Sequence, residues 1–122
     1  MGEKYLIDTN IIIDFSENKL LSEAKSFVMS IIDDSPYFSV INKIELLGFS
    51  TVSNDIIELV DTATILGLTD TIVHKTIAIR KSKRIKLPDA IIAATAIEHH
   101  LHLVTRNISD FQNIKGLKII TP

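Results

Sequence analysis

Four acidic residues could form one reactive site: Asp8, Glu45, Asp89 and Asp110. None of them has a Lys or Arg at a sequence position that obviously neutralises it. Carboxylates that converge in a partly desolvated crevice repel one another, and their pKa values rise. A divalent cation would relieve this repulsion. An all-oxygen ligand set suits Mg2+ or Mn2+, whereas zinc prefers His or Cys ligands.

A magnesium site of this kind is suited to phosphodiester chemistry. Mg2+ takes only a few carboxylates and retains waters, so coordination positions stay open for a substrate phosphate. The metal lowers the pKa of water to create a nucleophile and offsets charge on the attacked phosphate. The four acids therefore predict metal-assisted phosphodiester hydrolysis that consumes no 2'-hydroxyl.

Each acid also has an ordinary structural explanation. Asp8 could cap a helix, Glu45 could be an exposed helix residue, Asp89 could favour a helix N-terminus through the macrodipole, and Asp110 could be a loop residue. These explanations are preferred for each residue taken singly. Four acids at successive strand ends reverse that preference, although their convergence depends on the fold.

The elements that must position these acids alternate between short apolar strands and helices. We expect strands at residues 5–7, 37–40, 64–66, 103–104 and 117–120, and a loop or short turn at residues 107–113. We expect helices at residues 21–32, 42–48 and 56–60, from Thr69 or Asp70 to a basic cluster, and from Pro88 to residue 99. This alternation predicts an α/β fold with three α/β/α layers and a mainly parallel central sheet. The carboxyl ends of parallel strands border the functional crevice, and the four acids follow or nearly follow such ends.

Composition predicts a single domain over residues 1–122, because 46% hydrophobic residues can fill one core and no linker is visible. The longest apolar run, residues 90–97, is too short to cross a bilayer, so no membrane association is expected. The chain has no cysteine, which fits a cytoplasmic location and excludes disulfides and thiolate zinc sites. His99, His100 and His102 are better explained by a helix C-terminus than by a zinc site.

A net charge of -2 argues against binding nucleic acid by bulk electrostatics, so a polyanion site must be local. The candidate is a basic cluster of Arg80, Lys81, Lys83, Arg84 and Lys86. It precedes Asp89 closely and could hold an RNA backbone beside the metal site. A solvated helix end, where the dipole favours cations, explains it equally well.

Four segments resemble the motifs of the PIN-domain family, and specifically of its VapC-type toxins. Residues 5–10 (YLIDTN) resemble the opening motif, in which an apolar strand leads to the first metal-site Asp. Residues 39–46 (SVINKIEL) resemble the motif that supplies the Glu, and residues 105–111 (TRNISDF) resemble the last motif. Residues 87–96 (LPDAIIAATA) are the most specific match, around the third acid. Order, spacing and total length agree with the family.

The resemblance implies which residues act. It assigns Asp8, Glu45 and Asp89 to the metal site. Many relatives carry an acid where this chain has Asn107, which leaves Asp110 as the acidic candidate for a fourth ligand, and whether Asn107 or Asp110 completes the site stays open. The candidate orienting groups are Thr9, Asn10, Ser39, Thr105 and Asn107.

The resemblance also implies Mg2+- or Mn2+-dependent cleavage of RNA, a homodimer, and inhibition by a cognate VapB-type antitoxin. Two alternatives remain: a housekeeping RNA-processing nuclease of the same fold, and a non-catalytic interaction module whose acids bind a basic peptide. The presence of all four acids disfavours the interaction module, because such a protein could lose them without affecting its fold.

Overall fold

The structure is a computed structural model, and it describes residues 2–122; Met1 of the predicted domain lies outside the described residues. Five strands of the described chain form one sheet in the order β3-β2-β1-β4-β5, and every pair of neighbours is parallel. The strands are β1 (Tyr5–Ile7), β2 (Tyr37–Ser39), β3 (Thr64–Leu66), β4 (His102–Val104) and β5 (Lys118–Ile120). The predicted parallel sheet is therefore confirmed.

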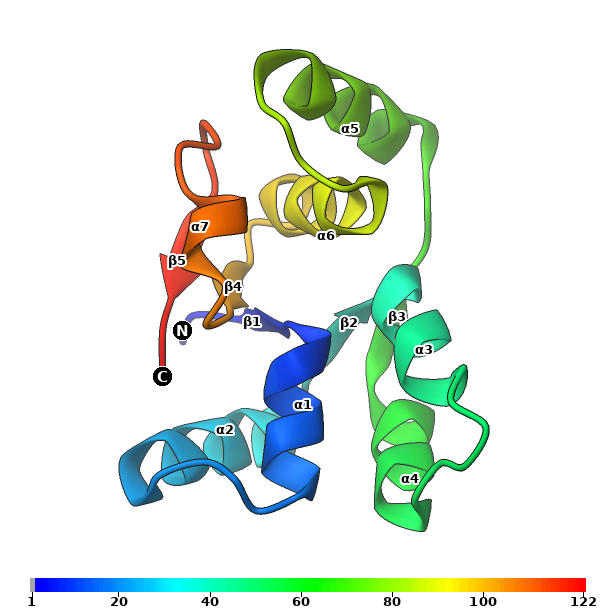
Figure 1. The fold of residues 1–122 in the computed structure, drawn as a ribbon, viewed down its shortest axis with the longest axis vertical. Coiled ribbons are helices and arrows are strands. Elements are labelled where there is room, and N and C mark those ends of the chain that lie inside the picture. The colour runs from blue at the N-terminus through cyan, green and yellow to red at the C-terminus, as the bar shows by residue number, and fades with distance from the viewer. Residues whose placement is uncertain (1) are drawn as a thin grey trace.

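Helices cover both faces of this sheet (Figure 1). One set comprises α1 (Thr9–Ser16), α2 (Ser22–Asp34), α3 (Val40–Leu47) and α4 (Asn54–Thr62), and the other comprises α5 (Asp70–Ser82), α6 (Leu87–Glu98) and α7 (Ile108–Phe111). Successive strand residues point to opposite faces. Leu6 and Leu103 accordingly join the core under α5, α6 and α7, while Ile7 and Val104 join the core under α1, α2 and α4. This is the predicted three-layer α/β/α arrangement.

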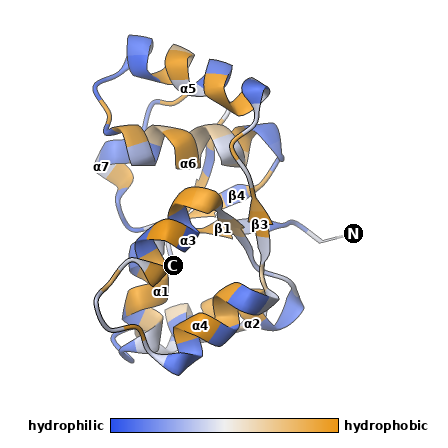
Figure 2. Cartoon of the chain, turned by 90° about the vertical axis from the view of Figure 1, so that its right-hand side faces the viewer, coloured by the Kyte–Doolittle hydropathy of each residue, from blue (hydrophilic) through white to orange (hydrophobic). Residues whose placement is uncertain are grey.

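Helix α6 is the most buried helix of the described chain, as its sequence predicted. Residues 90–96 are all buried, between the sheet and α5. The side of α6 that faces the viewer in Figure 2 is largely apolar, with hydrophilic residues toward its ends. Pro88 lies in the first turn, where no intrahelical donor is needed. The packing of α6 fixes the place of Asp89 at its N-terminus.

Side-chain caps explain why several helices start where they do. Asp8, Ser39 and Thr69 each accept a hydrogen bond from the backbone of the helix that follows, α1, α3 and α5 respectively. The cap at Ser39 ends β2 one residue earlier than expected, so Val40 begins α3.

Several other boundaries differ from the expectation by one or two residues; α4, for example, runs over Asn54–Thr62 where residues 56–60 were expected. Helix α2, expected at residues 21–32, runs two residues further, to Asp34. Residues 107–113, expected as a loop or short turn, contain the short helix α7. No helix in residues 2–122 is long and apolar enough to span a membrane.

Candidate active site

The four acids all lie at the edge of the sheet where the strands end. Asp8 joins β1 to α1, and Glu45 lies in the second turn of α3, which follows β2 directly. Asp89 lies in the first turn of α6, and Asp110 lies on α7, just after β4. The charges of Glu45 and Asp110 help to raise the pKa of Asp8, and those of Asp8, Asp110 and Glu45 help to raise the pKa of Asp89. The structure thus brings together the four acids that the sequence singled out.

Asp8 is the most buried acid of the group, at 6% exposed. Its Oδ1 accepts a hydrogen bond from the backbone N–H of Thr9 at 2.9 Å, and its Oδ2 accepts one from the Thr105 hydroxyl at 2.8 Å. Burial raises the pKa of Asp8, and these two hydrogen bonds oppose that rise; the charges of Glu45 and Asp110 reinforce it. Both oxygens of Asp8 are therefore held in fixed directions.

Glu45 is half-buried and is held by Thr9. The Thr9 hydroxyl donates to Glu45 Oε1 at 2.6 Å. The same hydroxyl accepts from the Asn42 amide nitrogen at 2.9 Å. Thr9 therefore contacts two acids of the site, through its backbone to Asp8 and through its side chain to Glu45.

Asp89 is half-buried, and its side chain makes no hydrogen bond with the described residues. Burial, followed by the charges of Asp8, Asp110 and Glu45, raises the pKa of Asp89 from 3.8 to about 6. Lys86, three residues earlier, opposes this rise. Both burial and the like charges of the site therefore disfavour the ionised form of Asp89.

Asp110 is linked to the rest of the site through Asn107. The Asn107 amide donates to Asp110 Oδ2 at 2.7 Å, and its backbone N–H donates to the Thr105 hydroxyl at 3.0 Å. Since Thr105 in turn donates to Asp8, one chain of hydrogen bonds joins Asp110 to Asp8.

Two other candidate orienting residues differ in their contacts. Ser39 is fully buried, and its hydroxyl accepts from the backbone N–H of Ile41 at 3.1 Å, so Ser39 caps α3. Asn10 is exposed on α1, without a side-chain hydrogen bond to any described residue. The sequence interpretation missed Asn42, which is fully buried and bonded to Thr9. Its spacing after Ser39, the pattern of a helix capping box, was the available signal.

The predicted basic cluster lies at the end of α5 and in the segment that leads to α6. Arg80 and Lys81 occupy the last turn of α5, and a shallow hollow is lined by residues 80–85. Lys83 is committed elsewhere, because its ammonium donates to the carbonyl oxygens of Ser109 and Gln112 at 3.3 and 2.7 Å. Lys83 therefore ties this segment to α7.

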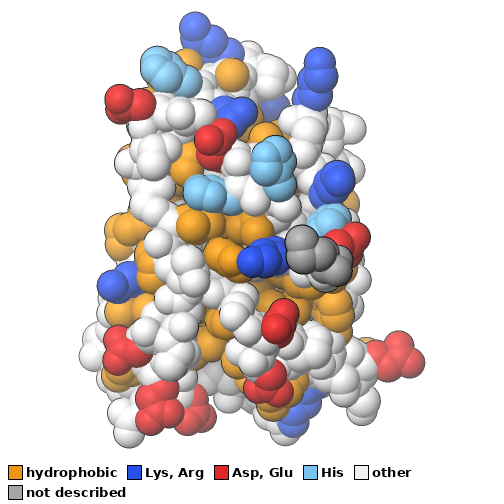
Figure 3. Space-filling view, turned by 180° about the vertical axis from the view of Figure 1, so that it is seen from behind, with side chains coloured by type: hydrophobic (Ala, Val, Ile, Leu, Met, Phe, Trp, Pro, Cys, Tyr) orange, Lys and Arg blue, Asp and Glu red, His pale blue; other side chains and the backbone are white. Residues whose placement is uncertain are grey.

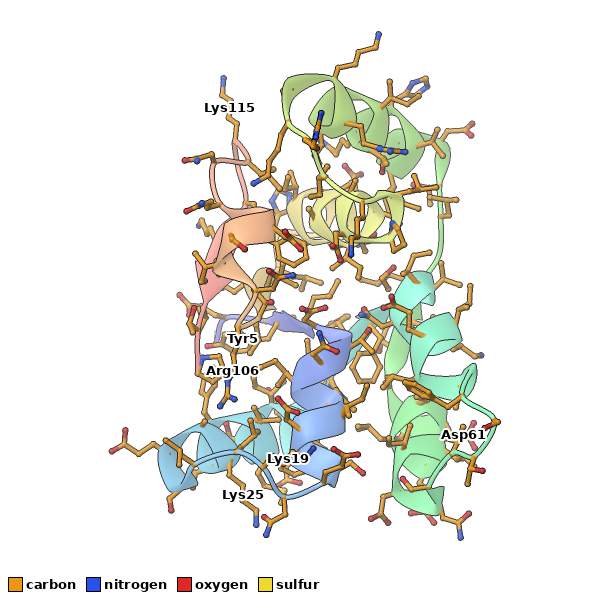
Figure 4. All side chains as sticks on the ribbon, viewed as in Figure 1. Tyr5, Lys19, Lys25, Asp61, Arg106 and Lys115 are labelled. Carbon is orange, nitrogen blue, oxygen red and sulfur yellow. The ribbon has the colours of Figure 1, made fainter. Side chains whose placement is uncertain are left out.

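Cations outside the cluster do not neutralise the four acids. Arg106 follows Thr105 directly, but it points toward α1 (Figure 4), where its guanidinium lies 3.8 Å from Asp14. In residues 2–122, the ion pairs involve none of the four site acids. The negative charge of the site thus has no direct protein counter-ion in the described chain.

No histidine is among the groups that shift the pKa values of Asp8 and Asp89 in the described chain. The histidines lie scattered over the upper half of the face in Figure 3, among charged side chains of both signs. His99 ends α6, as the helix-end interpretation predicted. Among the described residues, no three His, Asp or Glu side chains are close enough together to ligate one ion directly.

The donor set of the acidic site nevertheless suits Mg2+ or Mn2+. These ions prefer oxygen, and Mg2+ is commonly bound through one or two carboxylates while it keeps several waters. Such binding needs no cage of three direct ligands. A nearby cation would favour the ionised forms of Asp8 and Asp89, whose pKa values are raised.

Comparison with known proteins gives one family over nearly the whole chain. The family model described as "PIN domain" matches residues 5–117. "Ribonuclease VapC1" of Rickettsia felis is 52% identical over 33 residues, which are 27% of this chain. The match spans only 25% of the length of that curated relative.

Solved structures resemble the whole fold. A chain of a toxin-antitoxin complex from Klebsiella pneumoniae has 34% sequence identity and a TM-score of 0.78, with 98% of both chains covered. A chain of VapBC2 from Rickettsia felis, bound to a DNA fragment from its promoter, has 21% identity and a TM-score of 0.75. That alignment covers 97% of this chain and 98% of the other, and it supports the fold alone.

Proposed function

The chain belongs to the PIN domain family, and on this basis we propose that it is a Mg2+- or Mn2+-dependent endoribonuclease, the toxin of a VapBC-type toxin-antitoxin pair. The observation that carries the proposal is the convergence of four acids at one sheet edge. Burial, together with the charges of the other three acids, raises the pKa of Asp89 to about 6. Such a site favours a divalent cation and, through it, a phosphodiester substrate.

Each residue has a defined part in the proposal. Asp8, Glu45 and Asp89 hold the ion, directly or through its bound waters, and Asp110, oriented by Asn107, is the fourth acid of the site. When bound, Mg2+ or Mn2+ lowers the pKa of water and offsets charge on the attacked phosphate. Asp8 enters this role with both oxygens already directed by Thr9 and Thr105.

We place the RNA backbone along the basic cluster. Arg80, Lys81 and Arg84 are exposed, and Lys86 is close enough to Asp89 to lower its pKa. Phosphate contacts by such side chains position a nucleic acid without reading its sequence. Lys83 contributes less directly, because it holds α7 and with it the segment that carries Asp110.

The proposed antitoxin partner fits an apolar groove between α1 and α4. Two hollows that share Ser16 and Ile56 run along these helices. Phe49 lines one of them and is 54% exposed. A partner that covers this groove would bury apolar surface that a lone chain leaves in water. We further expect a homodimer and, since the substrate is RNA, a cytoplasmic location.

The antitoxin proposal is tested by co-expressing the chain with a candidate VapB-type antitoxin, sought as the product of a small open reading frame next to its gene. Phe49→Asp should weaken co-purification of that product at least ten-fold. Leu21→Asp, which changes an 80% exposed leucine at the start of α2, is the matched control and should leave it unchanged. Equal binding by wild type and Phe49→Asp would place the partner elsewhere.

The nuclease proposal is tested with purified protein, free of antitoxin, and a mixed RNA pool. We expect cleavage with Mg2+ or Mn2+, none with EDTA, and none by Asp89→Asn. Toxicity on expression that the neighbouring product relieves would separate a toxin from a housekeeping nuclease. Absence of cleavage by folded wild type, with metal present, would favour a non-catalytic interaction module.

A further inference from the structure

Asn42 is a fully buried polar residue that joins α3 to the acidic site. Its Oδ1 accepts from the backbone N–H of Ser39 at 2.8 Å, and its Nδ2 donates to the Thr9 hydroxyl at 2.9 Å. The first contact completes the capping box of α3. The second reaches 33 residues back along the chain to α1, and a helix cap does not require it.

These contacts fix the direction of every hydrogen bond up to Glu45. A backbone N–H can only donate, so the atom that faces Ser39 must be the Asn42 oxygen, and the amide nitrogen must face Thr9. The Thr9 oxygen then accepts a hydrogen bond from Asn42, and its own O–H is left to donate elsewhere. This O–H donates to Glu45 Oε1, 2.6 Å away.

Thr105 repeats the same construction on the other side of Asp8. Its hydroxyl accepts from the backbone N–H of Asn107 and donates to Asp8 Oδ2. The backbone N–H of Asn107 donates directly to the Thr105 hydroxyl, whereas the backbone N–H of Ser39 acts on the Thr9 hydroxyl through the Asn42 amide. In each case the hydroxyl is left to donate to a carboxylate. A hydroxyl without such an upstream donor could rotate its proton elsewhere.

We propose that Asn42 is a positioning residue of this site, which acts through Thr9 to hold the Glu45 carboxylate in the direction that binds the divalent cation. The inference rests on the proposed function. Asn42 is fully buried, so it touches neither RNA nor solvent. Groups that orient metal ligands typically change metal affinity or activity 10- to 100-fold when they are replaced.

The test is a double-mutant cycle of Asn42→Asp and Thr9→Val, read as the Mn2+ dissociation constant by calorimetry. Asn42→Asp keeps an oxygen for the Ser39 N–H, so α3 keeps its cap, but the new side chain cannot donate to Thr9. It also adds a negative charge, which by itself tightens cation binding. In the Thr9→Val background only this charge effect remains, so the cycle separates charge from orientation.

We expect Thr9→Val alone to weaken Mn2+ binding about 10-fold. Asn42→Asp changes the Mn2+ dissociation constant by one factor in the wild-type background and by another in the Thr9→Val background. We expect the change in the wild-type background to be at least about 5-fold less favourable for binding. Thr9→Ser, which keeps the hydroxyl, should retain the wild-type response to Asn42→Asp. At saturating Mn2+, Asn42→Asp should lower kcat for RNA cleavage and leave KM for RNA unchanged.

If Asn42→Asp changes the Mn2+ dissociation constant by the same factor in both Thr9 backgrounds, the role of Asn42 is overturned. The proposed function still stands in that case if the wild-type protein binds Mn2+ and cleaves RNA. If folded wild type neither binds Mn2+ nor cleaves RNA, the proposed function and this inference are both overturned. Circular dichroism melting of each variant establishes that the compared proteins are folded.

Discussion

Replacing Asp89 with Asn should stabilise the metal-free protein at neutral pH, although it removes a residue of the proposed site. Burial and three neighbouring carboxylates raise the pKa of Asp89 from 3.8 to about 6 in the folded chain. Between these values the folded chain binds more protons than the unfolded chain, so the free energy of unfolding falls as the pH rises. Below pH 4 the Asp89 carboxyl has no effect on the free energy of unfolding, because it is protonated in both states. Above pH 6 its destabilising effect is fully present.

The size of the effect follows from the shift. A change of about two pKa units corresponds to about 3 kcal/mol, at about 1.4 kcal/mol per unit. Asp89 is only half-buried, so solvent screening reduces this to about 1.5 kcal/mol. Asn also loses the favourable interaction of a carboxylate with the N-terminus of α6, about 0.5 kcal/mol. The net stabilisation is about 1 kcal/mol, or about 4 °C in Tm for a chain of this length.

The assay is thermal unfolding of wild type and Asp89→Asn in EDTA between pH 4 and pH 8. The variant should melt at or slightly below the wild-type temperature near pH 4 and about 4 °C above it at pH 7.5. Added Mn2+ should reverse the order, because a ligand that binds only the folded state stabilises wild type. A variant that is less stable than wild type at pH 7.5 in EDTA would refute the electrostatic reasoning, as would a pH-independent difference.

Two further changes test other parts of the site. Thr105→Val keeps the size of a fully buried residue but removes the hydrogen bond to Asp8 Oδ2, so Mn2+ binding measured by calorimetry should weaken about 10-fold; unchanged affinity would contradict the orienting role of Thr105. Joint replacement of Arg80, Lys81 and Arg84 by Ala should reduce RNA affinity and flatten its dependence on salt by about 0.7 in log–log slope for each lost phosphate contact. Filter binding to wild type and variant at several salt concentrations measures this slope, and an unchanged slope would remove the basic cluster from the RNA-binding surface.

Much of the fold was predictable because each strand-helix unit carries its own local signals. Apolar strands end in residues that cap the next helix, such as Asp8, and Pro88 marks the first turn of α6. The apolar circumference of α6 predicted its burial. Such signals depend on neighbours in the sequence, so the order of elements and the parallel sheet follow from them.

Contacts between distant segments were harder to predict. Asn42 fits a helix cap, and its sequence neighbours give no sign of the bond to Thr9, 33 residues away. In the sequence, Lys83 belonged to the basic cluster predicted to bind RNA. Its hydrogen bonds to the carbonyl oxygens of Ser109 and Gln112 could not be predicted, because they depend on how the end of α5 packs against α7. The acids were accessible to prediction because parallel strands must bring their carboxyl ends to one edge.

The most direct test of metal-dependent RNA hydrolysis at the acidic site is the chemistry of the RNA ends. Wild type and Asp8→Asn are incubated with a defined RNA in Mn2+ or EDTA, and the products are identified by mass spectrometry. Attack by water predicts linear phosphate ends from wild type in Mn2+, no 2',3'-cyclic phosphate, and no products from Asp8→Asn or in EDTA. Cyclic phosphate ends, cleavage in EDTA, or full activity of Asp8→Asn would contradict the account.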